Sequence, residues 1–346
     1  MLTLTNATAV AADEASGGST FGWNFNAGAG AFSFLAAGEV LELDYTLDAV
    51  DSSADHGHGT NHVRVTITGT NEAPVVGVVQ TPTPTPVVEA VSDVAALTAT
   101  GQLSVLDADL HDKVSFTVDS VSVDGTFPGK GGFTTEQLAS FKSMLTMTTA
   151  QLAAEPTSAD TVTWNFASGG SGVGAFSFLG QDETLVLNYV VKATDSTSAQ
   201  TATTVSVTLK GTNDAPVISG TAASSFTEPV LGAGGTQTLS SSGTLVVSDA
   251  DATDTASVSV ASVVATESQF NALSTESKAY VTANLNAFKG MLTLTNATAV
   301  AADEASGGST FEWNFNAGTG AFSFLAAGEV LELDYTLDAV DSSADH

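Results

Sequence analysis

Apolar and polar residues alternate strictly in two well-separated stretches of this chain. In VLELDYTLDAV, residues 40–50, every second side chain is apolar, and acids or threonine lie between them. The same alternation returns in LVLNYVVKA, residues 185–193. A period of two places the apolar side chains on one face, so each stretch predicts a half-buried β-strand.

A second alternating run follows each of these strands. It covers residues 63–67 in the first case and 205–209 in the second, and a loop rich in Asp, Ser, Thr or Gly joins each pair. This arrangement predicts two β-hairpins. Apolar patterning predicts further short strands at 103–106, 114–123, 162–166, 245–248 and 256–264.

Apolar residues recur at helical spacing in two other segments, 134–147 and 274–289. We expect short helices there, inserted between strands. Each repeat then has about seven or more short strands with turn signals between them, which favours a β-sandwich. The helices account for a module that is longer than the ~100 residues of an Ig-like domain.

The chain repeats itself at intervals of about 145 residues. Residues 1–56 and 291–346 are nearly identical, and a weaker copy lies between them. We therefore expect the C-terminal part of one module at 1–76, a complete module at 77–218 and a module lacking its last strand at 219–346.

The charge balance restricts the partners. Lys and Arg number 8 against 38 Asp and Glu, for a formal net charge of −30, so the chain repels nucleic acid and anionic lipid. No apolar run reaches membrane-spanning length, and we expect neither a nucleic-acid partner nor direct membrane insertion. The chain has no cysteine, so it forms no disulfides. No catalytic motif appears, and we expect no enzyme activity.

Acidic residues gather where modules should meet. The second strand of each hairpin leads directly into a GTN-acid-APV linker, so the hairpin loop lies at the opposite end of its module and faces the module before it. The linker of one module and the hairpin loop of the next should therefore meet at a joint. We expect the first joint to bring together Asn71, Glu72, Asp107, Asp109 and Asp195.

These joint residues suit a calcium ion. Asp107 and Asp109 are spaced i, i+2, so both side chains leave the same face of an extended segment. Carboxylates so close together repel unless a cation lies between them, and Ca²⁺ accepts six to eight oxygens in flexible geometry. The same reasoning assigns Asn213, Asp214, Asp249, Asp251 and Asp341 to the second joint.

The strings GTNDAPV at 211–217, AAGEVLELDYTLDAVD at 36–51 and DADLHD at 107–112 resemble VCBS repeats. These are cadherin-like extender modules of giant RTX-type bacterial adhesins. DADLHD is similar to the D-x-D ligand pair of cadherins, ATD at 193–195 to their A-x-D, and TND at 212–214 to a shortened form of their acidic linker. Two departures stand out, because the linker carries fewer acids and no glycine follows the DAD strings.

The resemblance implies an all-β fold of tandem Ig-like or cadherin-like β-sandwich modules with short helical insertions, arranged as an extended rod. It further implies calcium binding at the joints and contact between neighbouring modules of one fibre. The expected location is extracellular, at a bacterial cell surface reached by type I secretion. The expected function is a stalk in cell adhesion and biofilm formation.

The alternative function is a glycan- or protein-binding module that uses exposed loops or aromatic residues. Trp23, Phe25, Phe32 and Phe34 form either a sugar-stacking platform or part of the core, and one tryptophan per module favours the core.

Two further features stand outside this plan. The string HGHGTNH places three histidines at 56–62, where an exposed hairpin loop is favoured over a transition-metal site. The incomplete last module should leave an open strand edge, which residues 57–69 of another chain would pair with end to end.

Overall fold

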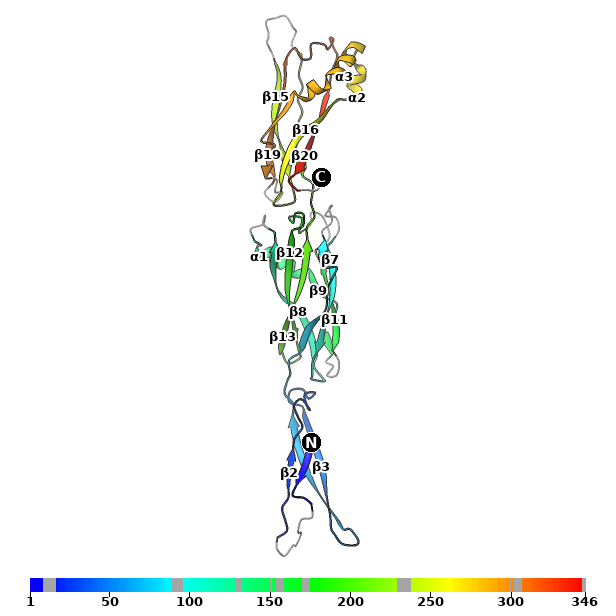
Figure 1. The fold of residues 1–346 in the computed structure, drawn as a ribbon, viewed down its shortest axis with the longest axis vertical. Coiled ribbons are helices and arrows are strands. Elements are labelled where there is room, and N and C mark those ends of the chain that lie inside the picture. The colour runs from blue at the N-terminus through cyan, green and yellow to red at the C-terminus, as the bar shows by residue number, and fades with distance from the viewer. Residues whose placement is uncertain are drawn as a thin grey trace.

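The chain is an elongated rod of three β-rich units placed end to end, as a computed structural model shows (Figure 1). The strands of residues 1–68 form the N-terminal unit, those of 75–210 the middle unit and those of 217–341 the C-terminal unit. The predicted domain boundaries at 76 and 218 stay a prediction. The structure describes all residues except 9–16, 89–95, 128–131, 150, 154–158, 170–174, 229–237, 299, 302–306 and 344–346.

The middle unit is a β-sandwich. Its strands are β5 (Val75–Thr83), β6 (Val87–Val88), β7 (Thr98–Leu106), β8 (Lys113–Thr126), β9 (Leu145–Met147), β10 (Gln151–Ala153), β11 (Asp160–Ala167), β12 (Thr184–Thr194) and β13 (Gln200–Lys210). One sheet has the order β5-β7-β11-β9 and the other β10-β8-β12-β13-β6. Both sheets contribute to one core, in which the rings of Phe166 and Tyr189 lie 6.4 Å apart. The predicted all-β sandwich is therefore confirmed.

The alternation in β12 follows from its position in the sheet. It pairs antiparallel with β8 on one side and with β13 on the other, so the predicted hairpin is confirmed. Its inward side chains, from Leu185 to Ala193, are fully buried. The intervening side chains face outward, and Lys192 lies 2.9 Å from Asp119 on β8. Burial of one face alone explains why apolar residues occur at every second position.

The helix α1 (Thr135–Ser143) is joined to the core of the middle unit. Thr134 forms a capping box at its N-terminus. Near its C-terminus, the carbonyl of Phe141 accepts a 2.9 Å hydrogen bond from the buried hydroxyl of Tyr189. The predicted helix over 134–147 was too long, because its last residues form β9 and pair with β11.

The C-terminal unit repeats much of this plan. Its elements are β14 (Val217–Ser219), β15 (Thr238–Ser248), β16 (Thr255–Ala265), α2 (Glu267–Ala272), α3 (Thr275–Lys289), β17 (Leu292–Thr295), β18 (Val300–Ala301), β19 (Ser309–Thr319) and β20 (Leu333–Asp341). The sheets have the orders β14-β15-β19-β17 and β18-β16-β20. The hydroxyl of Tyr335 donates a 2.7 Å hydrogen bond to the backbone carbonyl of Phe288 in α3. It corresponds to the hydrogen bond from Tyr189 to the carbonyl of Phe141 in α1. The predicted helix over 274–289 is confirmed.

The N-terminal unit is less buried than the other two. Its strands are β1 (Leu2–Thr5), β2 (Gly22–Phe25), β3 (Val40–Val50) and β4 (His58–Thr68), which form two two-stranded sheets, β1-β2 and β3-β4. Trp23 is 50% exposed, whereas Trp164 and Trp313 are 0% and 8% exposed. The prediction of a core tryptophan is thus confirmed for the middle and C-terminal units and wrong for Trp23.

Two histidines expected in a loop lie on a strand instead. β4 begins at His58, so only His56 remains in the turn. His58 lies 2.9 Å from Asp48, and His62 lies 3.1 Å from Asp44. The strand begins earlier than predicted because each residue of β3 has a partner opposite it on β4.

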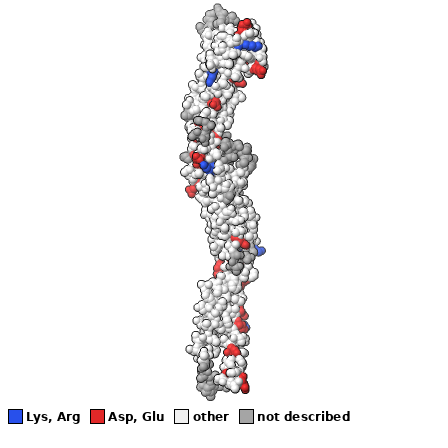
Figure 2. Space-filling model, turned by 45° about the vertical axis from the view of Figure 1, so that its right-hand side comes forward, with Lys and Arg blue, Asp and Glu red and all other residues white. Residues whose placement is uncertain are grey.

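Acidic side chains outnumber basic ones on the face shown in Figure 2, where they occur along the whole rod. No helix in the described part of the chain is both long and apolar enough to span a membrane.

Candidate metal centres at the two joints

The linker after the N-terminal unit is hydrogen-bonded to aspartates of the middle unit. The side-chain amide of Asn71 donates to Asp195 Oδ2 at 2.9 Å. The backbone N–H of Glu72 donates to Asp109 Oδ2 at 3.0 Å, and the N–H of Asp109 donates in turn to Asp107 Oδ1 at 3.1 Å. The first joint therefore brings together residues from two units, as the sequence predicted for Asn71, Glu72, Asp107, Asp109 and Asp195.

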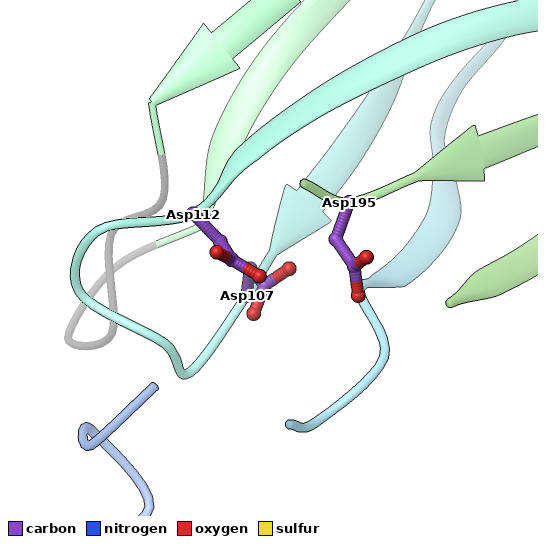
Figure 3. Close-up of side chains that lie close together, drawn as sticks. All are labelled: Asp107, Asp112 and Asp195. Carbon is purple, nitrogen blue, oxygen red and sulfur yellow. The ribbon is translucent and has the colours of Figure 1, made fainter. Parts of the chain in front are cut away.

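Three aspartates of the middle unit converge at this joint (Figure 3). Asp107 directly follows β7, Asp112 directly precedes β8 and Asp195 directly follows β12. One carboxylate oxygen of each lies within 4.8 Å of the other two. The three side chains are at most 6% exposed. Because they belong to strand ends from both sheets, the sandwich itself sets their spacing.

Several oxygens of the first joint are buried and accept no hydrogen bond from the described part of the chain. A buried polar atom without a partner is costly, by roughly 1–3 kcal/mol and by more when it is charged. Native structures hold few such atoms, and a bound ion is one of the usual reasons for them. The atoms are Asn71 Oδ1, Glu72 Oε2, Asp107 Oδ2, Asp109 Oδ1 and Asp112 Oδ2.

The pKa values of the first joint show how unfavourable its charges are. Burial raises the pKa of Asp107 and of Asp112, and the neighbouring carboxylates raise it further. Burial also opposes the ionisation of Asp195, but hydrogen bonds from Asn71 and from the chain just after Asp195 outweigh it and lower its pKa. The joint thus holds one stabilised carboxylate beside others that bind protons or cations readily.

The second joint repeats these contacts between the middle and C-terminal units. The side-chain amide of Asn213 donates to Asp341 Oδ2 at 3.0 Å. The N–H of Asp214 donates to Asp251 Oδ2 at 2.9 Å, and the N–H of Asp251 donates to Asp249 Oδ1 at 3.0 Å. The five residues predicted for this joint therefore also lie together.

The second joint also holds a cluster of carboxylates, of which Asp249 and Asp251 are buried and Asp254 and Asp341 are half-buried. One oxygen each of Asp249, Asp254 and Asp341 lies within 4.8 Å of the others. Asp249 Oδ2, Asp251 Oδ1 and Asp254 Oδ2 accept no hydrogen bond from the described residues. Burial, and then nearby carboxylates, raise the pKa of Asp249 to about 6 and that of Asp251 to about 8. At neutral pH this joint therefore holds carboxylates with a strong tendency to bind a proton or a cation.

Both joints have direct contacts outside the carboxylate cluster. At the first joint the N–H of Leu110 donates to the carbonyl of Phe34 at 3.3 Å, and His111 lies 2.8 Å from Glu39. At the second joint the N–H of Ala252 donates in the same way to the carbonyl of Phe178, at 3.3 Å. The loop between the DAD aspartates and the next strand thus touches the preceding unit in both cases.

The sequence missed two members of these clusters, Asp112 and Asp254. Each is the last acid of a DAD-x-x-D string, five residues after the first aspartate. The recurrence of this third acid in DADLHD and DADATD was the signal that could have identified it. The role of all these residues as metal ligands stays a prediction.

The donor atoms at both joints belong to one chemical class. They are carboxylate and amide oxygens, and no sulfur is present in the chain beyond methionine. An all-oxygen set with several negative charges suits a hard cation such as Ca²⁺ rather than zinc or copper.

Comparisons with known proteins are limited to distant structural similarity. No protein-family model matches the chain, and no curated protein matches it. The Protocadherin GammaB4 extracellular domain aligns with 14% identity over 87% of this chain and 38% of its own, with a TM-score of 0.26. A BcpA variant, the major pilin subunit of Bacillus cereus, aligns with 8% identity over 50% of each chain, with a TM-score of 0.22.

A third similar structure is the C-terminal domain of the Streptococcus agalactiae AgI/II polypeptide BspA. It aligns with 10% identity over 78% of this chain and 90% of its own, with a TM-score of 0.17. Scores of this size define no family. The class of this protein, an all-β chain that contains β-sandwich structure, rests on its own sheets.

Proposed function

We propose that this chain is a calcium-stiffened extender segment of a secreted bacterial surface adhesin. The observation that carries the proposal is the set of buried carboxylate oxygens without hydrogen-bond partners at both joints. At each joint these oxygens lie beside hydrogen bonds that connect two consecutive units. The resemblance to VCBS repeats supports the cell-surface setting, type I export and a role in adhesion and biofilm formation.

The residues of the first joint fit Ca²⁺ in number, charge and type. Asp107, Asp109 and Asp112 would hold the ion from the middle unit, and Glu72 would hold it from the linker. Asp195 would add a further negative charge beside the ion, because the hydrogen bond from Asn71 already holds its carboxylate in place. Ca²⁺ tolerates such an irregular oxygen set, whereas Mg²⁺ requires a near-octahedral one.

Charge neutralisation at the joints is the physical reason for stiffness. Burial, and then the carboxylate of Asp109, raise the pKa of Glu72, which shows that the linker and the next unit repel each other when both are ionised. A cation between them turns this repulsion into attraction and fixes the linker. Without the cation the hydrogen bonds from Asn71 and Glu72 to the middle unit are opposed by the repulsion between carboxylates, and the linker bends more easily. The contacts at Leu110 and His111 then carry more of the connection between the two units.

A stalk needs length rather than a unique binding surface, and near-identical repeats supply length. Extracellular calcium modules bind at about 10⁻⁴–10⁻³ M, so the stiffness would follow calcium levels outside the cell.

Small-angle scattering of the chain in millimolar calcium and in EGTA tests the proposal. We expect the maximum dimension to shrink in EGTA and to recover when calcium is restored. Magnesium at the same concentration is the control, and it should restore the length poorly. An equal length in all three buffers, together with a flat calcium titration by calorimetry, would remove the proposal.

A further inference from the structure

The turn between β17 and β18 carries a sequence motif that the joints do not explain. Residues 296–298 are Asn-Ala-Thr, and the same motif follows β1 at residues 6–8. Among the asparagines of the chain, only Asn6 and Asn296 have serine or threonine two residues later. Asn-x-Ser/Thr, in which x is not proline, is the acceptor motif for N-linked sugars on surface loops of secreted proteins. Because the motif is short, its place in the fold decides whether it is usable.

The turn lies at the side of the sandwich, where the chain crosses from one sheet to the other. β17 is an edge strand of one sheet of the C-terminal unit, and β18 is an edge strand of the other. The complete middle unit has the same crossing, from β9 to β10, which are also edge strands. The position of the turn is therefore a property of the module, and it lies outside the paired strands of both sheets.

The two side chains that the motif requires are exposed to solvent. Asn296 and Thr298 are exposed, whereas Ala297 between them is only 5% exposed. The carbonyl of Ala297 accepts a 2.6 Å hydrogen bond from the N–H of Val258 on β16, which fixes the turn against the sandwich. Within the described part of the chain, no side-chain hydrogen bond engages Asn296 or Thr298. The fold thus presents an amide and a hydroxyl together on a fixed turn.

A purely structural role explains the asparagine but not the threonine. Asn6 and Asn296 both have a φ of 56°, in the left-handed region that asparagine tolerates better than most residues. The backbone therefore favours asparagine at these positions. Thr298, in contrast, has an exposed side chain, and the corresponding residue of the middle unit is Gln151, so neither packing nor the strand requires threonine. The hydroxyl two residues after the asparagine is the group that sugar attachment requires.

We propose that Asn296 is an acceptor site for an N-linked sugar, and that Asn6 is the second copy of this site. The side-chain nitrogen of the asparagine attacks the anomeric carbon of a sugar diphosphate donor, and the bond between that carbon and the phosphate oxygen breaks. The diphosphate leaves with the electron pair, and the amide nitrogen gives up one proton to a base of the transferase. The product is a bulky, hydrated group on the side of the rod, outside the core. This inference goes beyond calcium stiffening and does not rest on it.

Mass spectrometry of the protein isolated from the cells that produce it tests the proposal. We expect the peptide that contains Asn296 to carry added sugar mass, which fragmentation assigns to that side chain. Asn296→Gln and Thr298→Ala should each remove this mass completely, whereas Thr298→Ser should keep it, because the hydroxyl remains. The Tm of each variant should equal that of the parent chain, since both positions are exposed.

The middle unit offers a matched gain of the site. Thr149→Asn combined with Gln151→Thr creates the same Asn-Ala-Thr string at the corresponding turn. We expect the peptide that spans residues 149–151 to gain sugar in this variant and to carry none in the parent chain. A soluble cell extract with a nucleotide-activated sugar, and cell membranes with a lipid-linked sugar, distinguish the two kinds of donor when each is added to the recombinant chain.

Two results would overturn the proposal. One is an Asn296 peptide from the native protein that carries no sugar. The other is sugar that persists at Asn296 in Thr298→Ala, which would show that the motif does not direct the attachment. Neither result affects the change in length expected in EGTA, so the calcium proposal is tested separately.

Discussion

The two oxygens of Asp107, and likewise those of Asp109, have different roles. Asp107 Oδ1 accepts the N–H of Asp109, and Asp109 Oδ2 accepts the N–H of Glu72. The second oxygen of each aspartate is buried without a partner. One oxygen therefore fixes the side chain and the other remains for a ligand. Asparagine would keep the first role and lose the second, since it has only one oxygen and carries no charge.

Replacement of Asp251 by asparagine tests this division of roles. We expect Asp251→Asn to fold normally, because one oxygen still accepts the N–H of Asp214. Calcium affinity at the second joint should fall by about 10–100-fold, the range found when groups that support a metal site are removed. Calorimetric titration should show one class of sites weakened and the other unchanged. Asp338→Asn, on the exposed face of β20, is the control and should titrate like the parent.

The raised pKa values of the second joint predict a pH dependence whose sign depends on calcium. Without an ion, Asp249 and Asp251 have pKa values of about 6 and about 8, while an unfolded aspartate has a pKa of about 3.9. Between about pH 4 and pH 8 the folded chain therefore holds more protons than the unfolded chain, and its stability decreases as the pH rises. In EGTA we expect a lower Tm at about pH 8 than at about pH 5.

Saturating calcium should reverse this order, because the cation binds the deprotonated carboxylates. Differential scanning calorimetry at the two pH values, with and without calcium, measures the direction in which the Tm changes with pH in each case. Asp251→Asn should flatten the slope in EGTA. A Tm in EGTA that increases with pH over this window would contradict the assignment of these aspartates as the titrating groups.

Strand packing explains where glycine is required in these sheets. Trp164 of β11 lies against Gly101 of β7, and a Cβ atom there would be 2.4 Å from the indole ring. Gly243 has the same relation to Trp313. Each tryptophan thus fills the space that a side chain on the neighbouring strand would occupy. This pairing of strands, and not the tryptophan alone, decides whether the ring is buried.

We expect Gly101→Ala to destabilise the middle unit by about 1–3 kcal/mol, because the added methyl group overpacks a rigid core. Gly59→Ala on β4 is the matched control, since a Cβ atom at that position meets nothing within 4 Å. Urea unfolding followed by tryptophan fluorescence measures both. Equal midpoints for the two variants would show that the ring moves aside without cost.

The whole rod contains two joints of the same design, separated by the length of the middle unit (Figure 1). Substitutions at sites so far apart, with no shared partner, usually have additive effects. In calcium, Asp109→Asn and Asp251→Asn should each reduce the maximum dimension partly, and the double variant should match the parent in EGTA. Scattering curves of the three variants measure this. If a single variant in calcium is already as short as the parent chain in EGTA, the two joints are coupled.

Local patterning was sufficient to predict most strands and the longest helix. The period of two in β3, β12 and β20 follows from one buried face, which any sandwich imposes on its strands. Patterning failed at the end of α1, because the apolar residues of β9 have the same composition as a last helical turn. It also placed His58 and His62 in a loop, since the polar face of a long strand looks like a loop in sequence.

Repeated strings and the direction of the hairpins were sufficient to predict which acids meet at the two joints, because a linker must leave a module at the end opposite its hairpin loop. The three-dimensional arrangement alone brought Asp112 and Asp254 beside them, since those residues reach the clusters only when two sheets pack together. It alone also exposed Trp23 while burying its copy Trp313. Identical residues have no fixed burial of their own, because the neighbouring strand decides how much water each one meets.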